Sequence, residues 1–344
     1  MRATNWVGDA IMSIPALKAL RARWADAEIV VLARPWVGAL YQGQGFADRV
    51  LVFDSDPRGR ERFNSRPAAS SLSKERFDVA LLFPNSFASA WLSWRAGIPE
   101  RIGYARDGRS MLLTKAIPVP RAGELPAHES YYYLELLRRA EWVKSLDTPD
   151  VTEIRLRIDP GAVASAQSKL STAGARSGKP WLAFAPGAAY GSAKCWPADR
   201  FSELADRLIA EFDADVILFG TASEHDIVER IAARMHHRPV NLAGQTPIGE
   251  LPALFAACRL FIGNDSGAMH VAAAAGLPVV AIFGSTDPEG TAPVTPRRTI
   301  VRRPVSCSPC FLRQCPVDHR CMTRVEVDAA HAAARGWLER STRG

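Results

Sequence analysis

The sequence predicts an α/β protein made of two Rossmann-like lobes, each built on a parallel sheet. Strand-like and helix-like patterns alternate along the chain, and several strand-like runs of the second half end at or beside a glycine. Strands that alternate with helices of this length form right-handed βαβ units. The 344 residues suffice for about two domains. We place the domains at residues 1–160 and 161–344.

The first lobe opens on a helical pattern and continues with strand-like runs. Residues 28–33 (EIVVLA) and 78–83 (DVALLF) are short apolar runs typical of buried parallel strands. Pro15 is tolerated in the opening helix only near its first turns. Five apolar residues recur in that helix at helical spacing: Ile11, Ile14, Leu17, Leu20 and Trp24.

The second lobe has the clearer alternation. Strands are expected within 180–187, 214–220, 258–263 and 278–284, and helices within 197–212, 224–235, 248–258 and 266–276. A last helical pattern at 325–342 is expected to pack on either lobe, including back on the first.

The charge and the hydropathy of the sequence limit the partners and the cellular location that we expect. There are 43 Lys and Arg against 36 Asp and Glu, which suits nucleic acid, an anionic membrane surface or a phosphorylated substrate. No nucleic-acid recognition motif is present, so we expect no nucleic-acid partner. No apolar run reaches the roughly 18 residues of a membrane-spanning helix, and the first residues lack a signal-peptide layout. We therefore expect a cytoplasmic protein.

The stretch FIGNDSGAMHVAAAAG suggests an anion site. After a buried strand, Asp265, Ser266 and Gly267 turn the chain into a helix of small residues. Ser266 is a natural N-cap, and Gly267 allows a ligand close to the backbone. The helix N-terminus favours a phosphate or diphosphate, which His270 would also face. The alternative is a capped turn with a histidine that only packs, and the residues alone leave both open.

Two further loops have a similar character. In FAPGAAYGSAKCWP a Pro-Gly turn and small residues lead to Lys194, a charge suited to phosphate, although a plain surface lysine has the same pattern. In LFGTASEHD, Glu224 is placed either to accept hydrogen bonds from ribose hydroxyls or to complement a helix dipole.

Asp9 follows Gly8 where the first helix begins. Asp is among the best N-caps, and the residues alone favour that role over a general base in a cleft between lobes. Asp54 and Asp56 end another strand-like run. They suit Mg or Mn, but the Asp-Pro sequence favours an ordinary turn.

Four cysteines lie close together near the end of the chain. Their spacings are CxxC, Cx4C and Cx5C, with His319 among them. Zinc is one explanation in a reducing compartment, and a cluster of reduced thiols is the one we favour. The cysteines are Cys307, Cys310, Cys315 and Cys321.

The combined motifs resemble the ADP-heptose:lipopolysaccharide heptosyltransferases of glycosyltransferase family 9, most of all the heptosyltransferase II group. The resemblance is carried by ATNWVGDAIMSIPALKALR, LLFPNSFASAWLSWRAGIPERIGY, APGAAYGSAKCWP and NDSGAMHVAAAAGLPVVAIFGSTDP. It implies the GT-B architecture, in which two Rossmann-like lobes face each other across a cleft. It also implies an inverting transfer of L-glycero-D-manno-heptose from ADP-heptose to the first heptose of the lipopolysaccharide inner core.

The resemblance also assigns residues. Asp9 matches the acid proposed as general base, which now outranks its role as a cap. The residues that match the donor site are Lys194, Glu224, Asp265, Ser266, Gly267 and His270. The residues of the acceptor-side motif are Asn85, Ser86 and Arg101. No metal or other cofactor is required, because Lys194 and a helix end can stabilise the ADP leaving group.

The implied acceptor is an anionic glycolipid, so the basic balance would hold the enzyme at the inner face of the inner membrane as a peripheral protein. Alternatives are a heptosyltransferase I-like enzyme or relative with another acceptor, a metal-dependent transferase centred on Asp54 and Asp56, and a nucleotide-binding module without catalysis. A zinc-stabilised interaction protein is a further alternative.

Relatives carry an apolar strand before the Gly-Asp motif, whereas only residues 1–5 precede Trp6 here. Losing about four buried side chains at ~1.5–3 kcal/mol each removes roughly 6–12 kcal/mol, comparable with a total stability of about 5–15 kcal/mol. We therefore expect the first strand to be truncated and the natural protein to begin several residues upstream.

Overall fold

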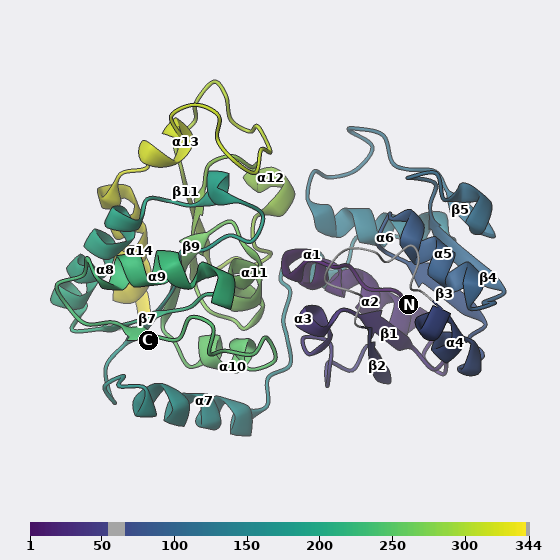
Figure 1. Ribbon diagram of the computed structural model, residues 1–344, viewed down its shortest axis with the longest axis horizontal. Coiled ribbons are helices and arrows are strands. Elements are labelled where there is room, and N and C mark those ends of the chain that lie inside the picture. The colour runs from purple at the N-terminus through teal and green to yellow at the C-terminus, as the bar shows by residue number, and fades with distance from the viewer. Residues whose placement is uncertain (54–65, 342–344) are drawn as a thin grey trace. The chain divides into compact units, whose positions relative to one another are not determined.

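The computed structural model of the chain describes residues 1–53 and 66–341 (Figure 1). Two compact units are present, Met1–Val151 and Thr152–Gly344. Each unit contains parallel strands and helices, and the units are described separately below. Asp54 and Asp56 lie outside the described residues.

The strands described in unit 1 pair in parallel. β1 (Val30–Ala33) pairs with β2 (Arg49–Val52), and β4 (Glu100–Tyr104) pairs with both β3 (Val79–Leu82) and β5 (Lys115–Ile117). Residues 1–3 lie between β1 and β3, since Arg2 forms parallel bridges to Leu32 and to Leu82. The spatial order is therefore β2, β1, residues 1–3, β3, β4 and β5, with the order reversing between residues 1–3 and β3.

The opening helical pattern of unit 1 forms two helices and not the single helix expected. α1 (Val7–Met12) ends at Ser13, and α2 (Ile14–Arg23) begins directly after it with Pro15 in its first turn. Pro15 has no N–H to continue the ladder of α1, and the Ser13 hydroxyl donates to the Ala10 carbonyl at 2.8 Å. The other helices of unit 1 are α3 (Pro35–Gly38), α4 (Arg66–Lys74), α5 (Phe87–Arg95), α6 (Glu129–Arg139), and the short 3₁₀ helices η1 (Ser110–Leu112) and η2 (Pro149–Val151).

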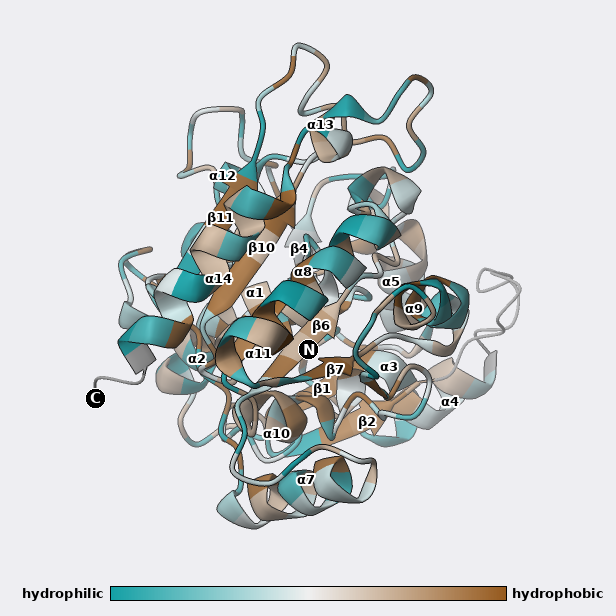
Figure 2. Cartoon of the chain, turned by 90° about the vertical axis from the view of Figure 1, so that its left-hand side faces the viewer, coloured by the Kyte–Doolittle hydropathy of each residue, from teal (hydrophilic) through white to brown (hydrophobic). Residues whose placement is uncertain are grey.

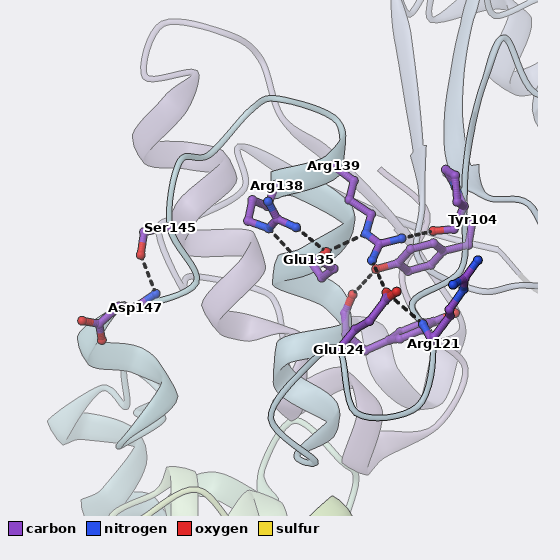
Figure 3. Close-up of polar contacts among 10 residues, drawn as sticks. Tyr104, Arg121, Glu124, Glu135, Arg138, Arg139, Ser145 and Asp147 are labelled. Atoms are coloured by element: carbon purple, nitrogen blue, oxygen red, sulfur yellow. Dashed lines mark hydrogen bonds and ion pairs between the residues drawn. The ribbon is translucent and has the colours of Figure 1, made fainter.

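A buried carboxylate anchors α6 (Figure 3). Glu135 accepts hydrogen bonds from Arg138 at 2.6 and 2.7 Å and from Arg139 at 2.6 Å. Burial acts to raise the pKa of Glu135, but the two arginines outweigh it and hold the pKa below its usual range. Arg139 also pairs with Glu124 at 2.6 Å, which ties α6 to the loop at 121–124.

Unit 2 contains one six-stranded parallel sheet in the order β11-β10-β9-β6-β7-β8. Its order reverses between β6 and β9, as in a doubly wound Rossmann sheet. Every residue of β6, β9 and β10 is buried, which explains their continuous apolar runs. The strands are β6 (Trp181–Ala185), β7 (Asp215–Leu218), β8 (Val240–Asn241), β9 (Leu260–Asn264), β10 (Val279–Phe283) and β11 (Arg298–Arg302).

Helices cover both faces of this sheet. α8 (Ala198–Phe212) packs between α9 (His225–Ala232) and α14 (Val327–Ser341), whereas α10 (Leu251–Ala256) packs with α7 (Pro160–Thr172) and α11 (Gly267–Ala274). Figure 2 shows α8 and α14 with hydrophilic outer faces beside the hydrophobic strand β10. The remaining helices are α12 (Pro288–Thr291), α13 (Arg320–Thr323), η3 (Ser192–Lys194) and η4 (Ala222–Glu224).

α14, the last helix, packs on α8 and on strands β9, β10 and β11 of unit 2. None of the helices within residues 1–53 and 66–341 has both the length and the apolar composition of a membrane span.

Candidate functional site

The loops that follow β6 and β9 meet at the switch point of the unit 2 sheet. Asn264, at the end of β9, is fully buried and bridges them. Its side-chain amide donates to the Pro186 carbonyl at 2.6 Å, and its side-chain oxygen accepts from the Trp196 N–H at 3.0 Å. Ligands of open α/β sheets bind beyond the carboxyl ends of the strands at such a point.

Lys194 and Asp265 form an ion pair between these two loops. The Nζ of Lys194 lies 2.6 Å from Oδ2 of Asp265, and the two side chains are only 12% and 4% exposed. The Thr286 hydroxyl, beyond the end of β10, donates to the same Asp265 oxygen at 2.7 Å. The ammonium also lies over the ring of Tyr190, 5.0 Å from its centroid. Asp265 therefore holds the Lys194 ammonium between three loops.

The turn before α11 leaves the Ser266 hydroxyl and the first N–H groups of the helix available to bind a ligand. Ser266 occupies the N-cap position as expected, but its hydroxyl makes no capping hydrogen bond. Its backbone is extended, and the buried Oγ has no hydrogen-bond partner among the described residues. Gly267 is the first residue of α11, and His270 lies buried one turn later. A helix start without a side-chain cap has N–H groups and a dipole that favour an anion.

Glu224 completes a capping box at η4. Its Oε2 accepts from the Thr221 N–H at 2.8 Å and from the Thr221 hydroxyl at 2.9 Å. Its Oε1 lies against Gly187, where an added Cβ would come within 2.1 Å of that oxygen. Glu224 is thus a first-turn acid that also contacts the Pro-Gly turn after β6, next to the switch point.

In unit 1, Asp9 lies in the first turn of α1. The N-cap of α1 is Trp6, so the expectation that Asp9 caps the helix is wrong. Burial raises the pKa of Tyr41 to about 12, and the negative charge of Asp9 adds to that shift. Burial also raises the pKa of Tyr133 well above its usual value, again with a contribution from Asp9. The carboxylate therefore lies near two buried phenols, beyond the end of residues 1–3.

Asn85 and Ser86 follow β3, on the other side of the reversal in unit 1. The Asn85 amide donates to the Tyr132 hydroxyl at 2.9 Å, and Ser86 is the N-cap of α5, accepting from the Ser89 N–H at 3.3 Å. Arg101 does not join them. It lies near the start of β4, and its guanidinium donates to the carbonyls of Ile98, Pro99 and Leu112.

A buried arginine supports the Asn85 loop and has no recognisable sequence signal. Arg109 is fully buried, and its guanidinium donates to the Asn85 side chain at 3.3 Å, to the Tyr104 carbonyl at 3.0 Å and to Pro84. Burial lowers its pKa to about 10. Gly103 leaves room for this side chain, since an added Cβ would lie 2.9 Å from it.

All six cysteines are free thiols. Cys321 is buried, and burial raises its pKa, with the neighbouring Cys307, Cys310 and Cys315 acting in the same direction. Within residues 1–53 and 66–341, no three His, Cys, Asp or Glu side chains converge in a way that could hold a metal ion.

Comparison with known proteins assigns the family. Residues 66–320 match glycosyltransferase family 9 (heptosyltransferase). The chain is 32% identical to lipopolysaccharide heptosyltransferase 2 of Escherichia coli over 87% of this chain and 86% of that protein. It is 33% identical to the protein of the same name from Salmonella typhimurium, with the same coverage. The chain belongs to glycosyltransferase family 9. It is therefore a glycosyltransferase of the heptosyltransferase family.

Solved structures of this family have the same fold. The E. coli ADP-heptose lps heptosyltransferase II is similar over 99% of this chain and 98% of its own, with a TM-score of 0.82 and 29% identity. The E. coli heptosyltransferase WaaC, solved with ADP, covers 98% of this chain with a TM-score of 0.71 at 16% identity. The α/β class and GT-B architecture predicted from the sequence are confirmed. Asp9 lies outside the segment 66–320 that matches the family.

Proposed function

We propose that this family 9 enzyme transfers L-glycero-D-manno-heptose from ADP-heptose to the first heptose of the lipopolysaccharide inner core, with inversion at the anomeric carbon. Relatives named as lipopolysaccharide heptosyltransferase 2 support a lipopolysaccharide acceptor, and the solved E. coli ADP-heptose lps heptosyltransferase II supports ADP-heptose as the donor. The observation that carries the proposal is the anion site at the switch point of unit 2, where Lys194 and the uncapped start of α11 lie on loops bridged by Asn264.

The diphosphate of the donor binds at these loops. The N–H groups at the start of α11 and the Ser266 hydroxyl donate to phosphate oxygens, and Gly267 lets the ligand approach the backbone. Asp265 acts by holding Lys194, since its carboxylate would repel a phosphate and already accepts from Lys194 and Thr286. His270 supports the same turn from α11. Glu224 contacts the ribose, next to Gly187.

In the reaction, Asp9 takes the proton of the acceptor hydroxyl as its oxygen bonds to the anomeric carbon. The bond between that carbon and the ADP oxygen breaks, and its electron pair leaves with ADP. Lys194 and the dipole of α11 stabilise the charge that develops on the leaving phosphate. These fixed positive groups serve the role that a divalent cation has in other transferases, so the proposed reaction requires no metal and no other cofactor.

The acceptor side of the proposal rests on unit 1. Asn85 and Ser86 lie beyond the end of β3, and we assign them to binding of the acceptor sugar. The acceptor is a glycolipid, and the excess of 43 basic over 36 acidic residues suits peripheral attachment to the anionic inner face of the inner membrane.

The test is product analysis with defined acceptors. The purified enzyme is incubated with ADP-heptose and core acceptors that carry no heptose or one heptose, with and without excess EDTA, and the mass and linkage of the product are determined. We expect one heptose to be added to the acceptor that already carries one. Transfer only to the heptose-free acceptor would make it heptosyltransferase I-like, and loss of turnover in EDTA would contradict the metal-free mechanism. ADP binding without transfer to either acceptor would indicate that the protein is a nucleotide-binding module without catalysis.

A further inference from the structure

The segment 305–319, here called the Cys-rich loop, is attached to the donor loops of unit 2 through backbone contacts. The Arg313 carbonyl accepts from the Ala193 N–H at 3.0 Å. The N–H groups of Cys310 and Phe311 both donate to the Ser285 carbonyl, at 3.0 and 2.9 Å. These bonds join the Cys-rich loop to the loops after β6 and after β10.

Side chains strengthen this attachment. The Tyr190 hydroxyl donates to the Phe311 carbonyl at 2.7 Å, and His319 Nε2 donates to the Ala193 carbonyl at 2.9 Å. Gly191 lies in close contact with the loop, since an added Cβ would come within 2.2 Å of the Arg313 carbonyl oxygen. The backbone of Arg313 is therefore held against η3, which carries Lys194.

The Tyr190 ring brings the two cations together. The Arg313 guanidinium lies 5.3 Å from the ring centroid, and the Lys194 ammonium lies 5.0 Å from the same centroid. The two charges are thus no more than about 10 Å apart. A separation within this limit is compatible with both cations binding one diphosphate, because each charged hydrogen bond spans about 2.8 Å.

The charge balance of the site favours a second cation. The charge of Lys194 is already matched by Asp265, whereas a diphosphate brings more than one negative charge. Arg313 is exposed, and among the residues that the structure describes no carboxylate pairs with its guanidinium. A guanidinium is suited to phosphate oxygens because its N–H groups form a planar fork.

We propose that Arg313 is a second diphosphate-binding residue of the donor site, placed there by the Cys-rich loop. This inference rests on the proposed function, since it takes the donor to be a nucleoside diphosphate sugar. It gives the Cys-rich loop a role that needs no metal: the loop carries a cation to the phosphates that Lys194 also contacts.

The test measures nucleotide binding by isothermal titration calorimetry. Arg313→Gln and Arg313→Lys are compared with the unaltered enzyme for ADP and for adenosine, which lacks phosphates. The matched control is Arg320→Gln, because Arg320 lies close by in the sequence but pairs with Asp318 at 2.9 Å. Thermal unfolding of each variant verifies that it is folded.

We expect Arg313→Gln to weaken ADP binding about tenfold or more, the range of a hydrogen bond to a charged group, and to leave adenosine binding unchanged. The ADP affinity of Arg313→Lys should lie between those of Arg313→Gln and the unaltered enzyme, since lysine keeps the positive charge but lacks the planar fork of N–H groups. Arg320→Gln should bind both ligands normally. ADP binding by folded Arg313→Gln equal to that of the unaltered enzyme would overturn the inference, and so would an equal loss of ADP and adenosine binding.

The two proposals fail in different ways. If the unaltered enzyme binds ADP, Arg313→Gln weakens that binding and no heptose is transferred, Arg313 keeps its role and the proposed function is wrong. If heptose is transferred and Arg313→Gln changes neither ADP affinity nor turnover, the function stands and the role of Arg313 is wrong.

Discussion

Removing one partner of the Lys194–Asp265 pair should destabilise unit 2 and abolish donor binding together. At the observed 2.6 Å separation, the gross attraction is about 6 kcal/mol at an effective dielectric constant of ~20. Desolvation offsets part of this, and breaking a buried pair costs about 3–5 kcal/mol, since the remaining charge is left buried. Because the Lys194 side chain is partly exposed, we expect Lys194→Met to lower the free energy of unfolding by about 3 kcal/mol, the lower end of this range.

Thermal unfolding measures this loss. About 3 kcal/mol corresponds to a Tm lower by roughly 6–12 °C for a unit of this size. Asp265→Leu should cost a similar amount, and the double variant should be more stable than the sum of the single losses predicts. ADP binding should be lost in all three. Additive losses, or single variants as stable as the unaltered protein, would refute the pairing as the basis of the site.

Two further predictions concern the supporting structure. Glu135→Gln should lower stability at neutral pH by about 1–2 kcal/mol. The folded-state pKa of Glu135 is depressed below the unfolded value of about 4.3. The stabilisation by the Glu135 carboxylate is therefore present above that pH and is lost as the pH falls through the folded-state pKa. Thermal unfolding at pH 7 and at pH values below about 4 should show the difference from the unaltered protein shrinking with acid, and a constant difference would contradict the assignment. Gly187→Ala should push Glu224 out of its capping box, lowering stability by ~0.5–2 kcal/mol and weakening adenosine binding. Gly336→Ala is the control in both measurements, because an added Cβ there meets no atom closer than 3.8 Å. If Gly187→Ala left both the stability and the adenosine affinity unchanged, the contact between Glu224 and Gly187 would be excluded.

Sequence patterns predicted the parts of the fold that are governed by local rules. β6, β9 and β10 are buried throughout, so their apolar runs identified them. β4 and β11 were not anticipated, because both contain charged residues, Glu100 and Arg101 in one and Arg298 and Arg302 in the other. The break at Ser13 has no local sequence signal, because Pro15 is also compatible with the first turns of a single helix.

Individual residues of the candidate site could be proposed from the sequence, but their arrangement could not. Lys194 and Asp265 were each expected near phosphate, yet their pairing joins loops 71 residues apart and depends on β6 lying next to β9. Arg109 and Arg313 follow no local pattern. Their guanidinium groups are placed by tertiary contacts, to Asn85 and Pro84 in one case and to Tyr190 in the other.

The most direct test of the central claim is heptose transfer by an Asp9→Asn variant, measured with ADP-heptose and a one-heptose core acceptor. The account predicts that the variant binds ADP with unchanged affinity but transfers heptose about 10²–10⁴-fold more slowly, the contribution typical of a general base. Transfer at the rate of the unaltered enzyme, with the same product, would contradict the assignment of Asp9 and the mechanism built on it.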